Sequence, residues 1–259
     1  NPGSSVKDRL GFALVRAAEE SGELPPGGTI VESTSGNTGI SLALIGAARG
    51  YRVILTMPAS MSKERRTLLK AYGAELVLTD PHKGMTEAVE TAKRIVAETP
   101  GAVLARQFES AANAEIHRTT TAPEILRDTD GRLDWFVAGS GTGGTVTGTG
   151  RALKETVPGV RVALVEPADS PVLTEGRAGG HRIQGIGPNF VPEVLDRSVV
   201  DEIFDVQFDD AIRVARDLAT REGILAGMSA GAAVWAALEI AARPESAGAR
   251  IVVIVPDAG

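Results

Sequence analysis

The chain alternates short, continuous apolar runs with longer stretches in which apolar residues recur at helical spacing. The short runs are rich in Val, Ile and Leu, and most of them lack the alternation with polar residues that marks a half-exposed strand. Continuous runs of this kind are typical of parallel strands covered by helices on both faces. The pattern therefore predicts an α/β fold. The predicted strands are residues 29–32, 52–57, 75–78, 103–107, 135–138, 161–166, 199–206 and 250–256.

The stretches between the predicted strands have the period of helices. Ser62 and Asp209 are the predicted N-caps of two of them, because a short polar side chain can accept a hydrogen bond from the first turn. Glycines just past the helix ends are expected in the left-handed conformation; they are Gly22, Gly50, Gly73 and Gly223. The predicted helices are residues 8–21, 39–49, 63–72, 84–98, 114–127, 145–155, 209–222 and 230–243.

The order of these elements predicts two doubly wound α/β lobes with mostly parallel sheets. We place the smaller lobe at residues 1–108 and the larger one at residues 109–259. Residues 167–192 are rich in Gly and Pro and lack clear periodicity. A connection of that length in a compact domain is often functional.

Composition narrows the possible functions. The 259 residues are 43% hydrophobic and 23% charged, which is enough to form a sizeable core. The net charge of −6 provides no basic surface for nucleic acid or an anionic membrane. There is no cysteine, and His82, His117 and His181 lack metal-ligand spacing, so we expect no metal site. No apolar stretch reaches membrane-spanning length and no signal segment is visible, which predicts a cytoplasmic protein.

The two ends of the sequence indicate a fragment. The chain does not begin with Met, and it stops directly after an apolar, strand-like run. We therefore expect that it is part of a longer protein.

Lys7 is the first residue that could carry chemistry. It follows a turn-rich segment and is expected in the first turn of a helix, where the helix dipole disfavours a cation. A lysine so placed favours the neutral amine, which can form an imine and act as a base. The alternative is an ordinary solvated lysine, which is how we interpret the other five lysines of the chain.

Three loops between an apolar run and a helix carry Gly together with hydroxyl groups. Residues 33–39 combine Ser, Thr and Asn, and residues 139–145 combine Gly, Ser and Thr. Both could present backbone N–H groups to a carboxylate or a phosphate. Residues 227–231 place Ser229 at a third helix start, where it could be no more than an N-cap.

The second of these loops also permits a different interpretation. Gly139, Gly141 and Gly144 fit the G-x-G-x-x-G pattern of dinucleotide-binding folds, and Glu166 ends the next predicted strand. A nicotinamide oxidoreductase is therefore an alternative, although it leaves Lys7 and residues 33–39 without a role. An acidic residue at a strand end is also often merely solvated.

Nine segments spread over nearly the whole chain resemble, in this order, the cysteine synthase (O-acetylserine sulfhydrylase) family of fold-type II pyridoxal-phosphate enzymes. They read NPGSSVKDR, ESTSGNTGISLA, LTMPASMSKERR, YGAELVLT, RQFESAANAEIHR, GSGTGGTVTG, VEPADSPVL, HRIQGIGPNFVP and EGILAGMSAGAA. The resemblance implies a fold like that of the tryptophan synthase β subunit. It also implies that segments before and after this chain are missing.

The resemblance implies a role for particular residues. Lys7, in the N-terminal lobe, would form the Schiff base with pyridoxal 5'-phosphate. Asn37 would bind the phenolic oxygen of the cofactor, and Ser229 would face its pyridine nitrogen. Because Ser229 is neutral and stands at a positive helix end, that nitrogen would stay unprotonated, which favours β-elimination and replacement. The phosphate cup would be Gly141, Thr142, Gly143, Gly144 and Thr145. The substrate carboxylate would be held by Thr34, Ser35, Gly36, Thr38 and Gln107, and Gly185 would line the active-site wall.

The implied reaction is the formation of L-cysteine from O-acetyl-L-serine and sulfide through an aminoacrylate. The resemblance further implies a homodimer, and family members of this type can dock the tail of serine acetyltransferase. Two other functions remain open: β-replacement of the cystathionine β-synthase type, and a non-catalytic relative that binds a partner.

Overall fold

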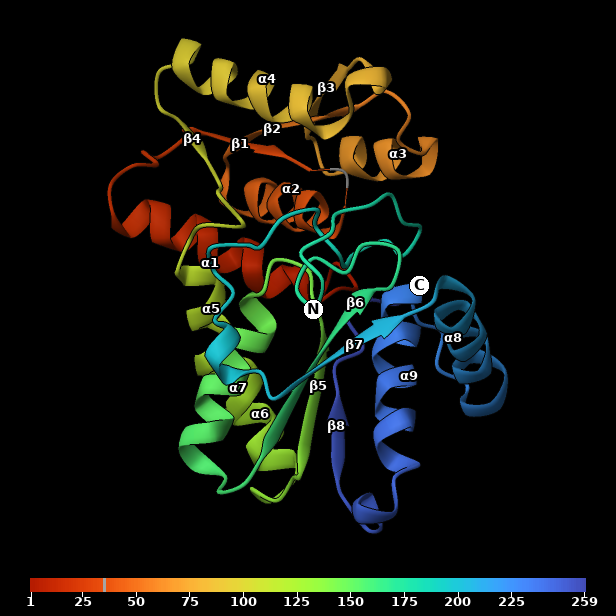
Figure 1. Cartoon of the computed structure of the whole chain (residues 1–259). Coiled ribbons are helices and arrows are strands. Elements are labelled where there is room, and N and C mark those ends of the chain that lie inside the picture. The colour runs from red at the N-terminus through yellow and green to blue at the C-terminus, as the bar shows by residue number, and fades with distance from the viewer. Residues whose placement is uncertain (35) are drawn as a thin grey trace. The chain divides into compact units, whose positions relative to one another are not determined.

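The computed structural model describes residues 1–34 and 36–259, and the chain forms two compact units (Figure 1). Unit 1 is Asn1–Ala112 and unit 2 is Asn113–Gly259. The division lies four residues beyond the boundary that we predicted at residue 108. Each unit contains one four-stranded sheet in which every strand pair is parallel.

The sheet of unit 1 has the strand order β3-β2-β1-β4. Its helices alternate with its strands along the chain, which is the arrangement that parallel crossovers require. The strands are β1 (Thr29–Ser33), β2 (Arg52–Pro58), β3 (Glu75–Thr79) and β4 (Ala102–Leu104). The helices are α1 (Lys7–Glu20), α2 (Asn37–Arg49), α3 (Lys63–Ala71) and α4 (Gly84–Glu98), with a short 3-10 turn, η1, at Pro81–Lys83.

The core of unit 1 lies on both faces of its sheet. Ile30 and Leu55 pack with α1, α2 and α3 on one face. Val31 and Ile54 pack against α4 on the other face, and Figure 1 shows α4 extending along it. Because neighbouring residues of one strand enter opposite cores, the strand is apolar without alternation, as the sequence indicated.

The sheet of unit 2 has the equivalent order β7-β6-β5-β8. Its strands are β5 (Trp135–Gly139), β6 (Arg161–Pro167), β7 (Glu202–Val206) and β8 (Ile251–Val253). Its α-helices are α5 (Ala112–Ile116), α6 (Ala122–Asp128), α7 (Gly144–Thr156), α8 (Phe208–Glu222) and α9 (Met228–Ala241). The π-helix η2 is His117–Thr121, and two 3-10 turns are η3 (Arg197–Val199) and η4 (Pro244–Ser246).

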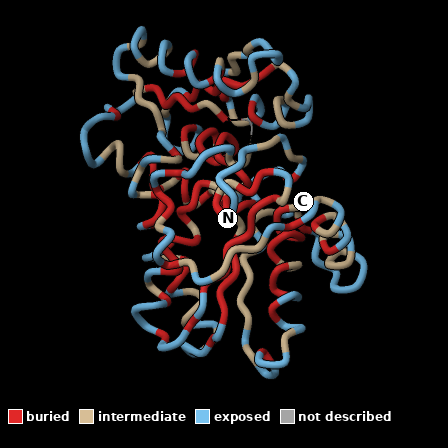
Figure 2. Tube along the Cα trace, viewed as in Figure 1, coloured by how far each residue is buried: buried red, intermediate tan, exposed pale blue. Residues whose placement is uncertain are grey.

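The helices of unit 2 also cover both faces of the sheet. Val137 and Val165 pack against α8 and α9, whereas Phe136 and Leu164 pack against α6 and α7. Figure 2 shows that β5 and β6 are buried along most of their length. The predicted α/β fold with two doubly wound, parallel sheets is therefore confirmed.

Most of the predicted helix ends are confirmed. Ser62 accepts a hydrogen bond from the Arg65 N–H at the start of α3. The prediction for Asp209 is wrong, because α8 begins at Phe208 and its N-cap is Gln207. The glycines expected in the left-handed conformation all have positive φ; they are Gly22, Gly50, Gly73 and Gly223.

The predicted helix at residues 114–127 is not one regular helix. It divides into α5, the π-helix η2 and α6, and Gly148 of α7 packs against its backbone. A Cβ atom at Gly148 would clash with the carbonyl oxygen of Ala114. Glycine therefore allows the two backbones to approach closely, and no periodicity in the sequence reveals the wider π turn.

Three strands are shorter than predicted, and one of them, β8, covers only Ile251–Val253 of the predicted residues 250–256. β4 ends at Leu104, before Gln107. β7 begins only at Glu202, because the Asp196 carboxylate accepts the Ser198 N–H and closes the turn η3 in front of it. None of the helices in the described part of the chain is long and apolar enough to span a membrane.

We predict that Gly148→Ala destabilises unit 2, because the added methyl group has no space against the Ala114 carbonyl. Overpacking of this kind lowers the free energy of unfolding by about 1–3 kcal/mol. Urea denaturation measures the change. Gly180→Ala is the control, since nothing lies within 4 Å of a Cβ at that position. Equal urea midpoints for the two variants would contradict the close helix contact.

Candidate active site

Each sheet has one position where consecutive connections leave in opposite directions, and ligands of doubly wound folds bind beyond the strand ends at that position. In unit 1 it lies between β1 and β4, which are neighbours in the sheet. The loop that contains Thr34, Gly36 and Asn37 follows β1, and Gln107 follows β4. The fold therefore brings the predicted carboxylate-binding residues of unit 1 to one edge of the sheet.

Hydrogen bonds join these two segments. The Thr38 hydroxyl donates to Gln107 Oε1 over 2.7 Å, and the Gly36 N–H donates to Thr34 Oγ1 over 3.3 Å. Thr34, Thr38 and Gln107 are buried. Helix α2 begins at Asn37, so the N–H groups of its first turn, which have no acceptor within the helix, lie at this loop. Ser35 lies outside the described residues.

Lys7 is the first residue of α1 and is partly buried. The segment before it is folded back on the helix: the Gly3 N–H donates to Asp8 Oδ2 over 2.6 Å, and the Lys7 N–H donates to Ser5 Oγ over 3.3 Å. Lys63 also opens a helix, α3, but it is exposed. Partial burial and the fixed turn therefore distinguish Lys7, not the helix start alone.

Glu32 holds the backbone at the ends of β1 and of the segment after β4, and it was not among the residues predicted from the sequence. Its carboxylate accepts the N–H groups of Ser33, over 2.9 Å, and of Gln107, over 3.4 Å. Burial raises the pKa of Glu32 from 4.5 to about 7, although these hydrogen bonds act in the opposite direction. The sequence did contain a signal: an acidic residue inside an apolar strand is rarely buried without a partner.

The corresponding position in unit 2 lies between β5 and β8. The glycine-rich loop follows β5, with Gly143 at φ +86° just before α7 begins at Gly144. Thr142 is buried, and its hydroxyl oxygen accepts a hydrogen bond from Asn113 Nδ2 over 2.9 Å. Since the amide donates, the hydroxyl proton of Thr142 can point to a ligand. No local pattern in the sequence had marked Asn113 as a candidate.

Thr145 lies in the first turn of α7, and its hydroxyl is 3.2 Å from His117 Nε2. Thr142 and Thr145 thus each contact a side chain from the segment that follows residue 112. The loop is consequently a helix start with two hydroxyl groups, each within hydrogen-bond distance of a side chain from this segment.

Ser229 is the second residue of α9 and is buried. It is not the N-cap, because that position belongs to Gly227. Gly185 has φ +94°, and a Cβ there would lie 3.4 Å from Ser229 Oγ. These two predicted residues are therefore neighbours, and the hydroxyl stands at a positive helix end. Asp257, which follows β8, lies beside Gly227 at the same helix start.

Glu166 is neither a free ribose ligand nor a solvated residue. It is 1% exposed, and its two oxygens accept the N–H groups of Leu173 and Thr174 over 2.9 Å. The carboxylate therefore anchors the long connection after β6. This use of Glu166 removes the main support for the dinucleotide interpretation.

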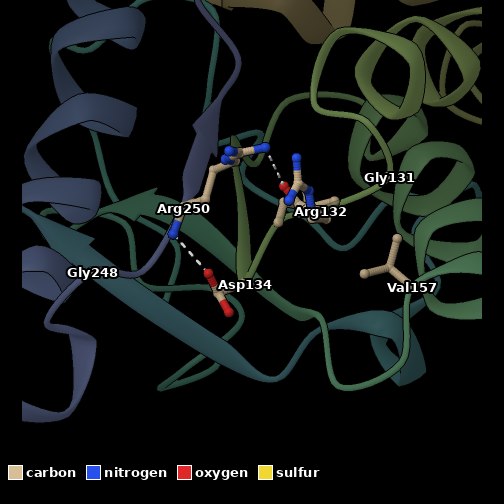
Figure 3. Close-up of a pocket in the computed structure, with 7 residues that line it drawn as sticks. Gly131, Arg132, Asp134, Val157, Gly248 and Arg250 are labelled. Carbon is tan, nitrogen blue, oxygen red and sulfur yellow. Dashed lines mark hydrogen bonds between the residues drawn. The ribbon is translucent and has the colours of Figure 1, made fainter.

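A pocket of about 360 Å³ lies at the amino ends of β5 and β8, away from the glycine-rich loop (Figure 3). The Arg250 guanidinium donates to the carbonyl oxygens of Thr129 and Arg132, and the Arg250 N–H donates to Asp134. The pocket contains none of the predicted site residues. Within the described part of the chain, no group of three His, Cys, Asp or Glu side chains could hold a metal ion.

Each unit, taken by itself, contains groups of the kind that bind pyridoxal phosphate or its substrates: unit 1 has a partly buried lysine and a helix start with hydroxyl groups, and unit 2 has two helix starts with hydroxyl groups. The family model for pyridoxal-phosphate dependent enzymes matches residues 1–257. The chain belongs to this family, and pyridoxal phosphate is its cofactor.

The chain is 47% identical to a cysteine synthase of Staphylococcus aureus, over all of this chain and 83% of the relative. It is also similar to a solved cysteine synthase (OASS) of Entamoeba histolytica, with a TM-score of 0.97, 47% identity and coverage of 100% and 77% of the two chains. A solved O-ureido-L-serine synthase gives a TM-score of 0.96 and 49% identity, with coverage of 100% and 82%. The relatives thus share the fold while their names differ in product.

We predict that Glu32 makes the stability of the protein fall as the pH rises. The folded state keeps a proton on Glu32 that the unfolded state releases between pH 4.5 and about 7. The contribution of this proton to the free energy of unfolding is complete below pH 4.5 and is lost as the pH rises through 7. At about 1.4 kcal/mol per pKa unit, the loss amounts to about 3 kcal/mol. Urea denaturation across this pH range measures the loss.

Glu32→Gln should remove this part of the pH dependence, whereas Glu90→Gln, at an exposed position of α4, should leave it unchanged. Parallel pH profiles for wild type and Glu32→Gln would show that Glu32 ionises normally in the folded protein.

Proposed function

We propose that the protein makes L-cysteine from O-acetyl-L-serine and sulfide, with acetate as the second product. The observation that carries this proposal is the similarity, along the whole chain, to enzymes named cysteine synthase. The donor groups of the two units support it, because they match the charges of the cofactor and of an amino-acid substrate.

An amino acid joined to pyridoxal phosphate has two anionic ends, a phosphate and an α-carboxylate. The chain has two helix starts that suit them. We assign the phosphate to Gly141, Thr142, Gly143, Gly144 and Thr145, because the glycines give close access to backbone N–H groups and two hydroxyls can donate. We assign the carboxylate to Thr34, Ser35, Gly36, Thr38 and Gln107, where the N–H groups at the start of α2 face the loop.

Lys7 is the proposed point of covalent attachment and the catalytic base. Pyridoxal phosphate, when bound, takes up the negative charge that develops at the substrate Cα. The Lys7 amine, once displaced by the substrate amine, removes the Cα proton. Acetate then leaves Cβ, sulfide forms the new C–S bond, and Lys7 returns the proton to Cα. Asn37 is assigned to the cofactor's phenolic oxygen.

Ser229 is assigned to the pyridine nitrogen, with Gly185 beside it. A carboxylate at this position would hold a proton on the nitrogen and strengthen the electron sink. A hydroxyl at a helix start gives no such charge, and this difference favours elimination at Cβ over transamination. Glu32 would act indirectly, since it fixes the Gln107 backbone next to the carboxylate site.

Similar proteins with this fold have names that imply different nucleophiles. The relative named O-ureido-L-serine synthase is as similar to the chain as the cysteine synthases are. Its name indicates that oxygen can replace sulfur as the atom joined to Cβ within this fold. The resemblance to cysteine synthases also leads us to propose a cytoplasmic homodimer that docks the tail of serine acetyltransferase. Light scattering tests the dimer, and titration with a peptide of that tail tests the docking.

We predict that Lys7→Ala loses at least about 100-fold in turnover, the range for loss of a positioned acid–base group. The variant should still bind pyridoxal phosphate, because the phosphate contacts come from other residues. Lys63→Ala is the matched control, since Lys63 also begins a helix but is exposed. Borohydride reduction followed by peptide mapping should place the cofactor on Lys7 in the wild type. A label on any other lysine would refute the assignment.

We predict that purified protein loaded with cofactor forms cysteine from O-acetyl-L-serine and sulfide. Parallel reactions contain homocysteine or hydroxyurea instead of sulfide, and mass spectrometry identifies the products. Cysteine as the main product supports the proposal. Cystathionine or O-ureido-L-serine as the main product would reassign the nucleophile, and the absence of all three products would favour a non-catalytic binding protein.

A further inference from the structure

His117 connects the proposed phosphate loop to a π-helix in unit 2. The ring is 2% exposed, and both of its nitrogens lie against hydroxyl groups. Nδ1 is 2.8 Å from Thr121 Oγ1, and Nε2 is 3.2 Å from Thr145 Oγ1. The three side chains thus form a continuous row that ends at the first turn of α7.

Local backbone geometry places this row. His117 and Thr121 are four residues apart on one helical turn, so their side chains share a face. α7 approaches that face with two glycines: a Cβ at Gly144 would clash with the Asn113 side chain, and one at Gly148 with the Ala114 carbonyl. The close approach brings Thr145 against the ring. π-helical turns occur frequently at functional sites, which is consistent with this position.

The hydroxyl chemistry determines the direction of the hydrogen bonds. A threonine hydroxyl has one proton to donate, and a phosphate oxygen only accepts. If the Thr145 hydroxyl donates a hydrogen bond to the phosphate, its oxygen accepts the hydrogen bond from His117, and His117 Nε2 therefore carries the proton. In the neutral ring Nδ1 then accepts, and the Thr121 hydroxyl donates to it.

We propose that His117 is a positioning residue for cofactor binding: its Nε2–H holds the Thr145 hydroxyl so that the hydroxyl proton points to the phosphate of pyridoxal phosphate. The inference rests on the proposed role of Thr145 in the phosphate cup. It adds a fixed tautomer, a second threonine and a specific direction of proton donation, from Thr121 through His117 to Thr145.

Substitutions test the row through cofactor affinity, measured by fluorescence titration of the apo-protein with pyridoxal phosphate. His117→Phe removes both ring nitrogens, so the Thr145 hydroxyl is no longer directed at the phosphate. Binding should weaken on the order of 10-fold, the lower range for loss of one hydrogen bond to a charged group, here from Thr145 to the phosphate. His117→Gln is the matched variant, because its amide can again donate to Thr145, and it should recover most of the affinity.

A double-mutant cycle separates positioning from general damage to the fold. Thr145→Val should itself weaken binding, and His117→Phe should cause no further loss in the Thr145→Val background. An equal loss from His117→Phe in both backgrounds would overturn the proposal, as would no loss in either. If Thr145→Val leaves the affinity unchanged, the assignment of the phosphate cup fails, and the inference fails with it for that identifiable reason.

The tautomer gives a test that needs no destabilising variant. 15N-histidine NMR of the holoenzyme reports which ring nitrogen carries the proton, and His117→Gln assigns the signal among the three histidines of the chain. We expect a neutral ring with the proton on Nε2. A neutral ring protonated on Nδ1 would mean that Thr145 donates to His117 and not to the phosphate, and would overturn the proposal.

Discussion

The ends of parallel strands determine where this protein can bind anions. Every strand pair in both sheets is parallel, so all strands of a unit end at the same edge, and the helices that follow begin there with N–H groups that have no acceptor within the helix itself. The strand order reverses direction between β1 and β4 in unit 1 and between β5 and β8 in unit 2, and ligands of such folds bind beyond the strand ends at this point. Each unit therefore has one helix start suited to an anion before any side chain is considered.

Buried polar side chains behind the loops convert these helix starts into sites with a defined shape. Glu32 fixes the backbone of Gln107, whose side chain accepts the Thr38 hydroxyl. In the glycine-rich loop, Asn113 Nδ2 donates to the Thr142 hydroxyl, and His117 Nε2 lies 3.2 Å from the Thr145 hydroxyl. Buried polar groups are costly unless they are paired, so these contacts allow few alternative loop conformations. Because Thr142 accepts from Asn113, its hydroxyl proton remains available to a ligand.

The sequence predicted most strands, most helix ends and the loops between them, for physical reasons that differ between these elements. The unbroken apolar run at β5 predicted a strand buried on both faces, and Gly50 and Gly223 marked helix ends because only glycine adopts a positive φ without strain. The candidate residues of the loops stood out in the sequence because hydroxyls and glycines cluster there. The π-helix η2 and the supporting residues Glu32 and Asn113 were not found, since their roles depend on partners tens of residues away in the chain. The start of β7 was also missed, because it follows a turn that is closed by the Asp196 carboxylate and the Ser198 N–H and not by local pattern.

We propose that the start of α7 receives the phosphate and that the start of α2 receives the substrate carboxylate. A crystal structure of the Lys7→Ala variant with pyridoxal phosphate and O-acetyl-L-serine measures the position of the phosphorus atom directly. We expect phosphate oxygens within hydrogen-bond distance of the N–H groups of residues 141–145 and of the Thr142 and Thr145 hydroxyls. A phosphate bound instead at the loop that contains Thr34 and Asn37 would contradict it.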